Sequence, residues 1–202
     1  MGKVDSNKKQ KENSLLKTAF ESFTTKGFSK TSISDIVNKA GVAKGTFYLY
    51  FKDKYDIRNK LISHKSSQLF RNAADELEKN GESLDFEEKI IFIIDNIINQ
   101  LNENQSLLTF ISKNLSWGIF KSALTSPTLD DDVNFSDVYN SMLSEAPYEF
   151  KNPEIMLFMI VELVSSTCYS AILYSEPCDI SELKPYLFET VRLIINQQKK
   201  SV

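Results

Sequence analysis

The stretch from residue 31 to residue 54, TSISDIVNKAGVAKGTFYLYFKDK, constrains the fold of this chain more than any other. Ser32 and Asp35 match an S-x-x-D box, in which the serine hydroxyl accepts a hydrogen bond from a free amide of the first helical turn. Apolar residues then follow at the i, i+3, i+4 and i+7 spacing of one helical face, which predicts a helix with one buried side. Gly41 supplies the backbone freedom of a left-handed helix end, so a sharp turn is expected there.

A second, shorter helix is predicted from Ala43 to about Tyr50. It must be held by its neighbours, because isolated helices of fewer than about 12 residues are marginal in water. Phe47 and Phe51 are four residues apart and can point inward together. The remaining positions carry an ammonium group, hydroxyl groups and a bare backbone, all suited to phosphate oxygens and base edges, and this physical pattern is a helix-turn-helix. These outward residues are Lys44, Gly45, Thr46, Tyr48 and Tyr50.

The pattern Gly-Val-x-Lys-Gly-Thr-x-Tyr-x-Tyr-Phe-x-x-Lys over residues 41–54 resembles the tetracycline-repressor (TetR) family of bacterial regulators. The resemblance extends over about residues 15–62, and it implies that the outward residues lie on a DNA recognition helix. It also implies that Thr31 and Ser32 lie at the phosphate-facing start of the preceding helix, and that Lys54 opens a fourth helix beside the DNA backbone. Ala43 departs from the family, which often has serine there, and the change would remove one phosphate hydrogen bond.

The distribution of charge agrees with this motif. The net charge of the chain is −3, but residues 1–60 carry 13 basic and 6 acidic residues, whereas residues 61–202 carry 11 and 21. A basic first part is attracted to phosphate, and an acidic remainder is held away from a duplex. Residues 1–10 are polar and lysine-rich and are predicted to be a flexible basic arm. A first helix from about Lys11 to Lys26 then begins a DNA-binding domain that spans residues 11–54.

The helical pattern continues through residues 55–202, which are predicted to form an effector-binding and dimerisation domain. A helix from Lys54 to about Asn80 links the two domains. The fold class is therefore all-α, with an N-terminal helix-turn-helix domain of three helices and a C-terminal helical domain. Further helices are predicted at about residues 86–101, 105–124, 135–143, 154–175 and 180–200.

The last two helices, about residues 154–175 and 180–200, are strongly apolar, and exposed apolar helices usually meet a partner. The family resemblance implies that they form a four-helix homodimer interface. A two-fold dimer also reads two half-sites and roughly doubles the binding free energy of one recognition helix. Glu162 leaves an uncharged run of only 13 residues, Leu163 to Ser175. Because a membrane span needs about 20, no membrane partner is expected.

No grouping of catalytic residues emerges, and no cofactor or metal motif, so a protein that is not an enzyme is expected. The single histidine, His64, has no cysteine or histidine at metal-ligand spacing, and Cys168 and Cys178 have no second cysteine pair. Two cysteines in a chain of this size suggest reduced thiols in a cytoplasm, which is the expected location. A redox role for either cysteine stays open.

Aromatic and methionine residues of the second domain are candidates for lining an apolar ligand cavity between helices. The same residues suit a plain core, because cores are built from apolar stripes at helical spacing. An apolar or cationic small molecule is favoured as effector, with Glu162 as a polar anchor. The candidate pocket residues are Phe110, Trp117, Phe120, Met156, Met159, Glu162 and Tyr169.

The resulting hypothesis is a homodimeric transcriptional repressor that binds a palindromic operator through residues 31–54 and is released by a small-molecule effector. The alternative is a DNA-binding regulator without an effector, whose second domain only dimerises or binds a protein partner. A dry, fully packed second domain would favour the alternative, whereas a cavity of several hundred Å³ would favour the sensor.

Overall fold

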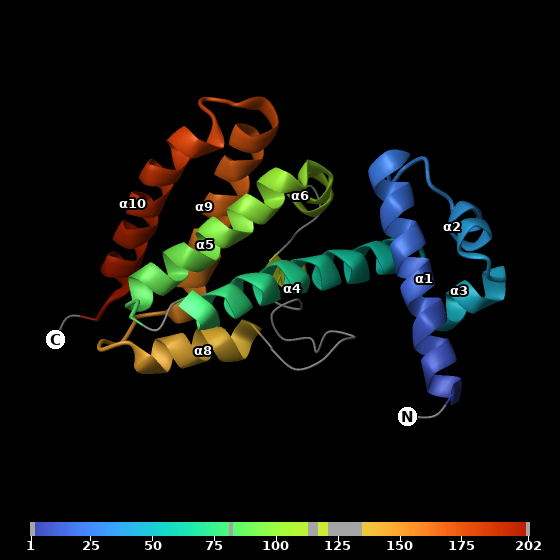
Figure 1. Cartoon of the computed structure of the whole chain (residues 1–202), viewed down its shortest axis with the longest axis horizontal. Coiled ribbons are helices and arrows are strands. Elements are labelled where there is room, and N and C mark those ends of the chain that lie inside the picture. The colour runs from blue at the N-terminus through green and yellow to red at the C-terminus, as the bar shows by residue number, and fades with distance from the viewer. Residues whose placement is uncertain (1–2, 81–82, 113–116, 121–134, 201–202) are drawn as a thin grey trace. The chain divides into compact units, whose positions relative to one another are not determined.

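The computed structural model describes residues 3–80, 83–112, 117–120 and 135–200 (Figure 1). Over these ranges the chain is all-helical, as predicted, and the one β-type pairing found in them is an isolated antiparallel bridge between Phe150 and Lys199. The chain divides into two compact units, Met1–His64 and Lys65–Val202. The division falls inside a helix, ten residues later than the predicted domain boundary between residues 54 and 55.

Unit 1 contains α1 (Lys3–Thr25), α2 (Ile33–Ala40), α3 (Lys44–Tyr50) and the first part of α4 (Lys54–Asn80). α1 already begins at Lys3, so the structure places residues 3–10 of the predicted flexible arm in this helix. Polar residues such as lysine and glutamine are good helix formers, so a helix can extend over them without burying anything. The buried core of the unit is drawn from all four helices and includes Leu15, Ala19, Phe23, Ile36, Phe47, Phe51, Ile57 and Leu61.

The ends of α2 are those that the sequence predicts. The Ser32 Oγ accepts a hydrogen bond from the Asp35 amide at 3.1 Å, and the Asp35 carboxylate accepts one from the Ser32 amide at 2.8 Å. The hydrogen bonds from the Ser32 backbone and side chain lower the pKa of Asp35 to about 2. At the other end Gly41 adopts φ of 68°, the left-handed conformation that glycine allows without strain.

Over the described residues, unit 2 combines the last part of α4 with α5 (Phe86–Glu103), α6 (Gln105–Ser112), α8 (Phe135–Glu145), α9 (Pro153–Tyr174) and α10 (Ile180–Gln198) (Figure 1). α5 is central: it contacts α6, α8, α9 and α10, and it buries Ile90, Ile93, Ile94 and Ile98, as its broad apolar surface predicts. Of the helix predicted over residues 105–124, the structure describes α6 and a helical piece at residues 117–120. The rest of it and the acidic residues Asp130–Asp132 lie outside the described residues.

α9 is the one helix of the described ranges that is long and apolar enough to cross a membrane by length and composition alone. In unit 2 it contacts α5, α6 and α10, and Met156, Ile160 and Cys168 on it are buried in the core. Core helices of globular proteins pass the same test of length and composition. Figure 1 shows α9 and α10, in orange and red, as neighbouring helices of this unit.

The burial of Met156 predicts a large effect on stability. Met156 is completely buried, so truncation in Met156→Ala leaves a cavity in the core and should lower the free energy of unfolding by about 2–5 kcal/mol. Met159 lies one turn further on and is only half-buried, so Met159→Ala should cost clearly less. Urea unfolding followed by circular dichroism measures both, and equal losses would contradict the assignment of Met156 to the core.

Candidate nucleic-acid interface and ligand cavity

The outer face of α3 is open to solvent, while one phenylalanine anchors the helix. Phe47 has no exposed surface and packs against Phe51, with ring centroids 5.4 Å apart. Around it Lys44, Gly45 and Tyr48 are exposed, and Thr46 and Tyr50 are half-buried. The structure thus brings the five predicted outward residues together on one short helix and leaves their polar groups within reach of a partner.

Gly45 occupies a position where the described protein makes no demand for glycine. Its backbone has no left-handed φ, and a Cβ built on it would meet no described atom within 4 Å. Gly41 is different, because its φ of 68° would strain any other residue. The bare backbone at position 45 therefore leaves space on the outside of the helix, where a duplex could approach closely.

Thr31 and Lys54 are engaged within unit 1. Thr31 is 1% exposed, and its hydroxyl lies 2.8 Å from the Gly27 carbonyl oxygen and 3.2 Å from that of Ser22. The Lys54 ammonium donates to the carbonyl oxygens of Phe28 and Thr31, at 2.8 and 2.9 Å. These contacts tie the start of α4 to the loop before α2, so both side chains position the helix-turn-helix. Ser32, in contrast, remains exposed.

Two residues at or near α3, Leu49 and Lys60, were not predicted from the sequence to contribute to this surface. Leu49 is 78% exposed, although an apolar residue in an amphipathic helix is usually assigned to the core. Its spacing could have revealed it: at about 100° per residue, position 49 lies roughly opposite the buried Phe47. Lys60 donates a hydrogen bond from its ammonium to the Tyr50 carbonyl oxygen at 2.9 Å and so satisfies the end of α3. Only a folded structure reveals this second contact, because the two residues are ten positions apart.

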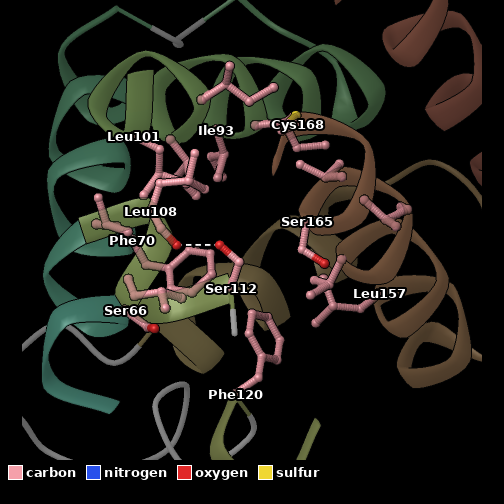
Figure 2. A pocket seen from close by; sticks show the side chains of 18 of the residues that line it. Ser66, Phe70, Ile93, Leu101, Leu108, Ser112, Phe120, Leu157, Ser165 and Cys168 are labelled. Atoms are coloured by element: carbon pink, nitrogen blue, oxygen red, sulfur yellow. Dashed lines mark hydrogen bonds between the residues drawn. The ribbon is translucent and has the colours of Figure 1, made fainter. Parts of the chain in front are cut away.

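Unit 2 contains an apolar cavity of about 120 Å³ between α4, α5, α6 and α9, to which Phe120 also contributes (Figure 2). Its described lining contains no charged side chain; the polar members are Ser66, Ser112, Ser165 and Cys168. Burial raises the pKa of the Cys168 thiol to about 11, so this group is neutral at physiological pH. The cavity therefore offers a ligand an uncharged, largely aliphatic surface.

Of the seven predicted pocket residues, the structure places only Phe120 in this lining. Trp117 stacks on Phe120 with ring centroids 5.2 Å apart, and Glu162 is exposed on α9. On α9 the side that faces the cavity runs through Leu157, Val161 and Cys168, together with neighbours at helical spacing. Phe110 and Met156 are buried elsewhere in the unit, and Met159 and Tyr169 are half-buried outside the described lining. The sequence pattern shows that α9 is apolar on several sides, but not which side faces the cavity.

Within the described part of the chain, neither site offers the ligands of a metal centre. Among the residues that the structure describes, no three histidine, cysteine, aspartate or glutamate side chains are grouped closely enough to hold a metal ion. Asp95, a carboxylate on the central helix α5, is paired with the Lys184 ammonium of α10 at 2.6 Å. The described carboxylates thus do not offer a cationic ligand a place in the cavity.

Known proteins resemble this chain in the sequence of its N-terminal part and in the fold of nearly the whole chain. Residues 15–61 match the family model described as bacterial regulatory proteins of the tetR family. The chain is 45% identical over 64 residues to the uncharacterised HTH-type transcriptional regulator YvdT of Bacillus subtilis, a match that covers 32% of this chain and 31% of YvdT. The first curated relatives are each matched over less than half of their length.

Solved structures are similar over nearly the whole chain. A TetR-family transcriptional regulator from Streptomyces coelicolor has a TM-score of 0.68 at 12% identity, over 93% of this chain and 99% of that one. The transcriptional regulator FadR from Bacillus subtilis, solved in complex with stearoyl-CoA, has a TM-score of 0.63 at 20% identity, over 88% of this chain and 96% of that one. At these identities the similarity establishes a shared fold.

The contrast between Lys54 and Lys44 gives a prediction about stability. Lys54→Met removes an ammonium that donates to two backbone carbonyl oxygens, so it should lower the free energy of unfolding of unit 1 by about 1–3 kcal/mol. Lys44→Ala removes an exposed ammonium and should change it by less than about 0.5 kcal/mol. Hydrogen exchange of the α2 and α3 amides reports on this unit; unchanged protection in Lys54→Met would contradict its positioning role.

Proposed function

We propose that this chain, which belongs to the TetR family of bacterial regulators, is a homodimeric repressor that binds a palindromic DNA operator and is released by a small apolar effector. The observation that carries the proposal is the outer face of α3. A helix of seven residues is held by one buried phenylalanine and presents Lys44, Gly45 and Tyr48 to the outside. A cationic, hydroxyl-rich surface beside a bare stretch of backbone suits the major groove, where a recognition helix contacts phosphates and base edges.

The charges of the two units support this orientation toward DNA. Unit 1 has 13 basic and 6 acidic residues, and unit 2 has 11 and 21. The basic unit is therefore the one that attracts the phosphate backbone, and the acidic unit is repelled by it. Leu49 adds an apolar group to the same exposed helix face, and such a group suits contact with the methyl group of a thymine.

The homodimer is proposed to form through α9 and α10. Both helices expose large apolar side chains in the single chain: Phe158 and Tyr174 on α9, and Tyr186 and Leu193 on α10, of which Leu193 is 64% exposed. Two such helices from each of two copies would cover these surfaces in a four-helix interface. A two-fold dimer then presents two copies of α3 to the half-sites of a palindromic operator.

The effector is proposed to be neutral and apolar, because the described lining of the cavity contains no charged side chain. A cationic effector anchored by Glu162 loses its support, since Glu162 is exposed outside this lining. FadR of Bacillus subtilis was solved with stearoyl-CoA, a ligand that contains a long acyl chain. The cavity here, about 120 Å³, is nearer in size to an engineered cavity of ~150 Å³ that binds benzene. A longer chain would have to displace lining side chains.

α4 provides a covalent route between the effector and the DNA-binding unit. The helix runs from Lys54 in unit 1 to Asn80 in unit 2, and Ser66, Leu69 and Phe70 on it line the cavity. An effector changes DNA affinity only if it binds two conformations of the dimer with different affinity. The effector would favour the conformation whose recognition helices do not fit successive half-sites.

The small volume of the cavity also supports a second candidate function. A site for a drug-sized ligand usually occupies ~300–1,000 Å³, and 120 Å³ lies below that range. A regulator without an effector, whose second unit serves only for dimerisation or for a protein partner, fits a cavity of this size. Binding of small apolar probes distinguishes the two functions.

DNA binding through Lys44 is tested by selecting duplexes from a random pool and titrating the best one at 50 and 200 mM salt. Wild-type protein should enrich a two-fold sequence and bind it with strong salt dependence, because each phosphate contact releases counterions. Lys44→Ala should weaken binding and reduce the salt slope by about 1 if the ammonium meets a phosphate, or change the preferred base if it meets guanine.

Lys79→Ala is the control for this experiment, since it removes an exposed lysine at the end of α4 in unit 2. It should leave affinity and salt slope unchanged. If wild-type protein enriches no sequence at either salt concentration, the proposed operator binding is wrong; if Lys44→Ala behaves like wild type, Lys44 is not part of the interface.

The proposed dimer interface predicts that a charged substitution on α10 changes the mass of the protein in solution from that of a dimer to that of a monomer. Leu193→Glu places a carboxylate on the exposed apolar surface of α10 and should shift the protein from dimer to monomer at micromolar concentration, because the charge would be buried between copies. Asn102→Glu adds the same charge at an exposed position of α5 and should leave the dimer intact. Analytical ultracentrifugation separates the two masses. A dimer that persists in Leu193→Glu would exclude this surface as the interface.

A further inference from the structure

The residues of α3 that lie opposite the buried Phe47 have no hydrogen-bonding side chain. At about 100° per residue, Gly45 and Leu49 each lie within about 20° of the point opposite Phe47. These two residues form the apex of α3, the part of the helix that is turned furthest from the core of unit 1. The polar residues lie on the two flanks of the apex, Lys44 and Tyr48 on one side and Thr46 and Tyr50 on the other.

The apex of α3 leaves an open apolar space between its two residues. Leu49 is 78% exposed, more than any other large apolar side chain in the described part of the chain. A leucine side chain in a helix leans toward the residue four positions earlier, which here is Gly45. A Cβ built on Gly45 would nevertheless meet no described atom within 4 Å, and this includes the Leu49 side chain. There is therefore room beside the leucine for one methyl group, since carbon atoms in contact are about 3.5–4.0 Å apart.

The major groove of DNA presents one apolar group that fits this space, the 5-methyl group of thymine. The other distinguishing groups of the base edges are donors and acceptors, for which a leucine side chain and a bare backbone carbon offer no partner. Unit 1 has 13 basic and 6 acidic residues, which favours a polyanion as the partner of this surface. The ammonium and hydroxyl groups on the flanks suit the phosphates along the two walls of the groove, so the apex faces the bases.

We propose that Gly45 and Leu49 together are a specificity-determining contact of α3, and that they recognise the 5-methyl group of one thymine in each half-site. The inference rests on the proposed function, in which α3 enters the major groove of an operator. It deepens that function by assigning the sequence preference at one base pair to apolar contact. At this base pair the shape of the space over Gly45, closed on one side by Leu49, selects the base.

Uracil is a suitable replacement for thymine, because it pairs with adenine in the same way and lacks only the methyl group. The best duplex from the random pool is synthesised again with uracil in place of one thymine in each half-site, at one symmetric pair of positions at a time. Titration of the full chain measures the dissociation constant of each duplex. For one such pair, the constant of the wild-type protein should rise by about 15-fold, because burial of a methyl group changes an affinity about fourfold and both half-sites are altered.

The quantity to compare between variants is the ratio of the uracil constant to the thymine constant at this position. Leu49→Ala removes the side chain that would contact the methyl group, so the ratio should fall to about one. This variant should remain folded, because Leu49 is exposed. Gly45→Ala puts a Cβ into the space that the methyl group would occupy, so it should weaken binding of the thymine duplex more than of the uracil duplex and also lower the ratio.

Lys44→Ala is the matched control, since it changes an exposed residue on the flank of the same helix. It should weaken binding of the thymine and uracil duplexes by the same factor and so leave the ratio unchanged. This control separates a general loss of affinity for DNA from a loss of methyl recognition.

The outcomes separate this inference from the function on which it rests. If wild-type protein binds the selected duplex and no replacement of thymine by uracil weakens binding, the inference is wrong, although operator binding stands. If a replacement weakens binding equally in wild type and in Leu49→Ala, another residue recognises the methyl group and the inference is also wrong. If the pool selection enriches no duplex, the proposed operator binding fails and the inference fails with it.

Discussion

The anchoring of α3 by Phe47 is the interaction on which the proposed DNA-binding surface depends. Seven residues cannot form a stable helix alone in water, so α3 exists only because Phe47 is buried against Phe51 and the rest of unit 1. The same burial turns the opposite side of the helix outward. Thr31 and Lys54 then fix the segments on either side, through hydrogen bonds to backbone carbonyl oxygens. The burial of Phe47 and the hydrogen bonds of Thr31 and Lys54 thus determine which side chains of α3 are exposed to a partner.

Features determined by local chemistry were predictable from the sequence, and features determined by distant contacts were not. The capping box of Ser32 and Asp35 and the left-handed Gly41 require only neighbouring residues, and the structure contains both. The inward direction of Phe47 followed from its spacing. In contrast, the engagement of the Lys54 ammonium by carbonyl groups more than 20 positions away has no local signature. The start of α1 at Lys3 escaped prediction because the sequence of residues 3–10 has no apolar stripe at helical spacing.

The cavity of unit 2 could be predicted from the sequence only in part, for the same reason. The broad apolar surface of α5 indicated a core helix, whereas the helix at residues 154–175 was predicted for the dimer interface. Because α9 is apolar on several faces, the arrangement of neighbouring helices selects the face that lines the cavity. Aromatic residues and methionines were therefore poor guides to the lining of the cavity, which consists mostly of leucine, isoleucine and valine. The lone carboxylate Glu162 attracted attention because it interrupts an apolar run, yet it simply faces solvent.

Position 45 illustrates how binding and folding place different demands on one residue. Glycine generally favours a helix less than alanine does, and an added Cβ at Gly45, the second residue of α3, would meet no described atom within 4 Å. Folding of the described protein thus does not require glycine at this position. A mutational scan scored for thermal stability would show whether alanine is favoured at this position. If the proposed function is right, a scan scored for repression would penalise any side chain that keeps the helix from the duplex, and the two scans would diverge at the residues that contact DNA.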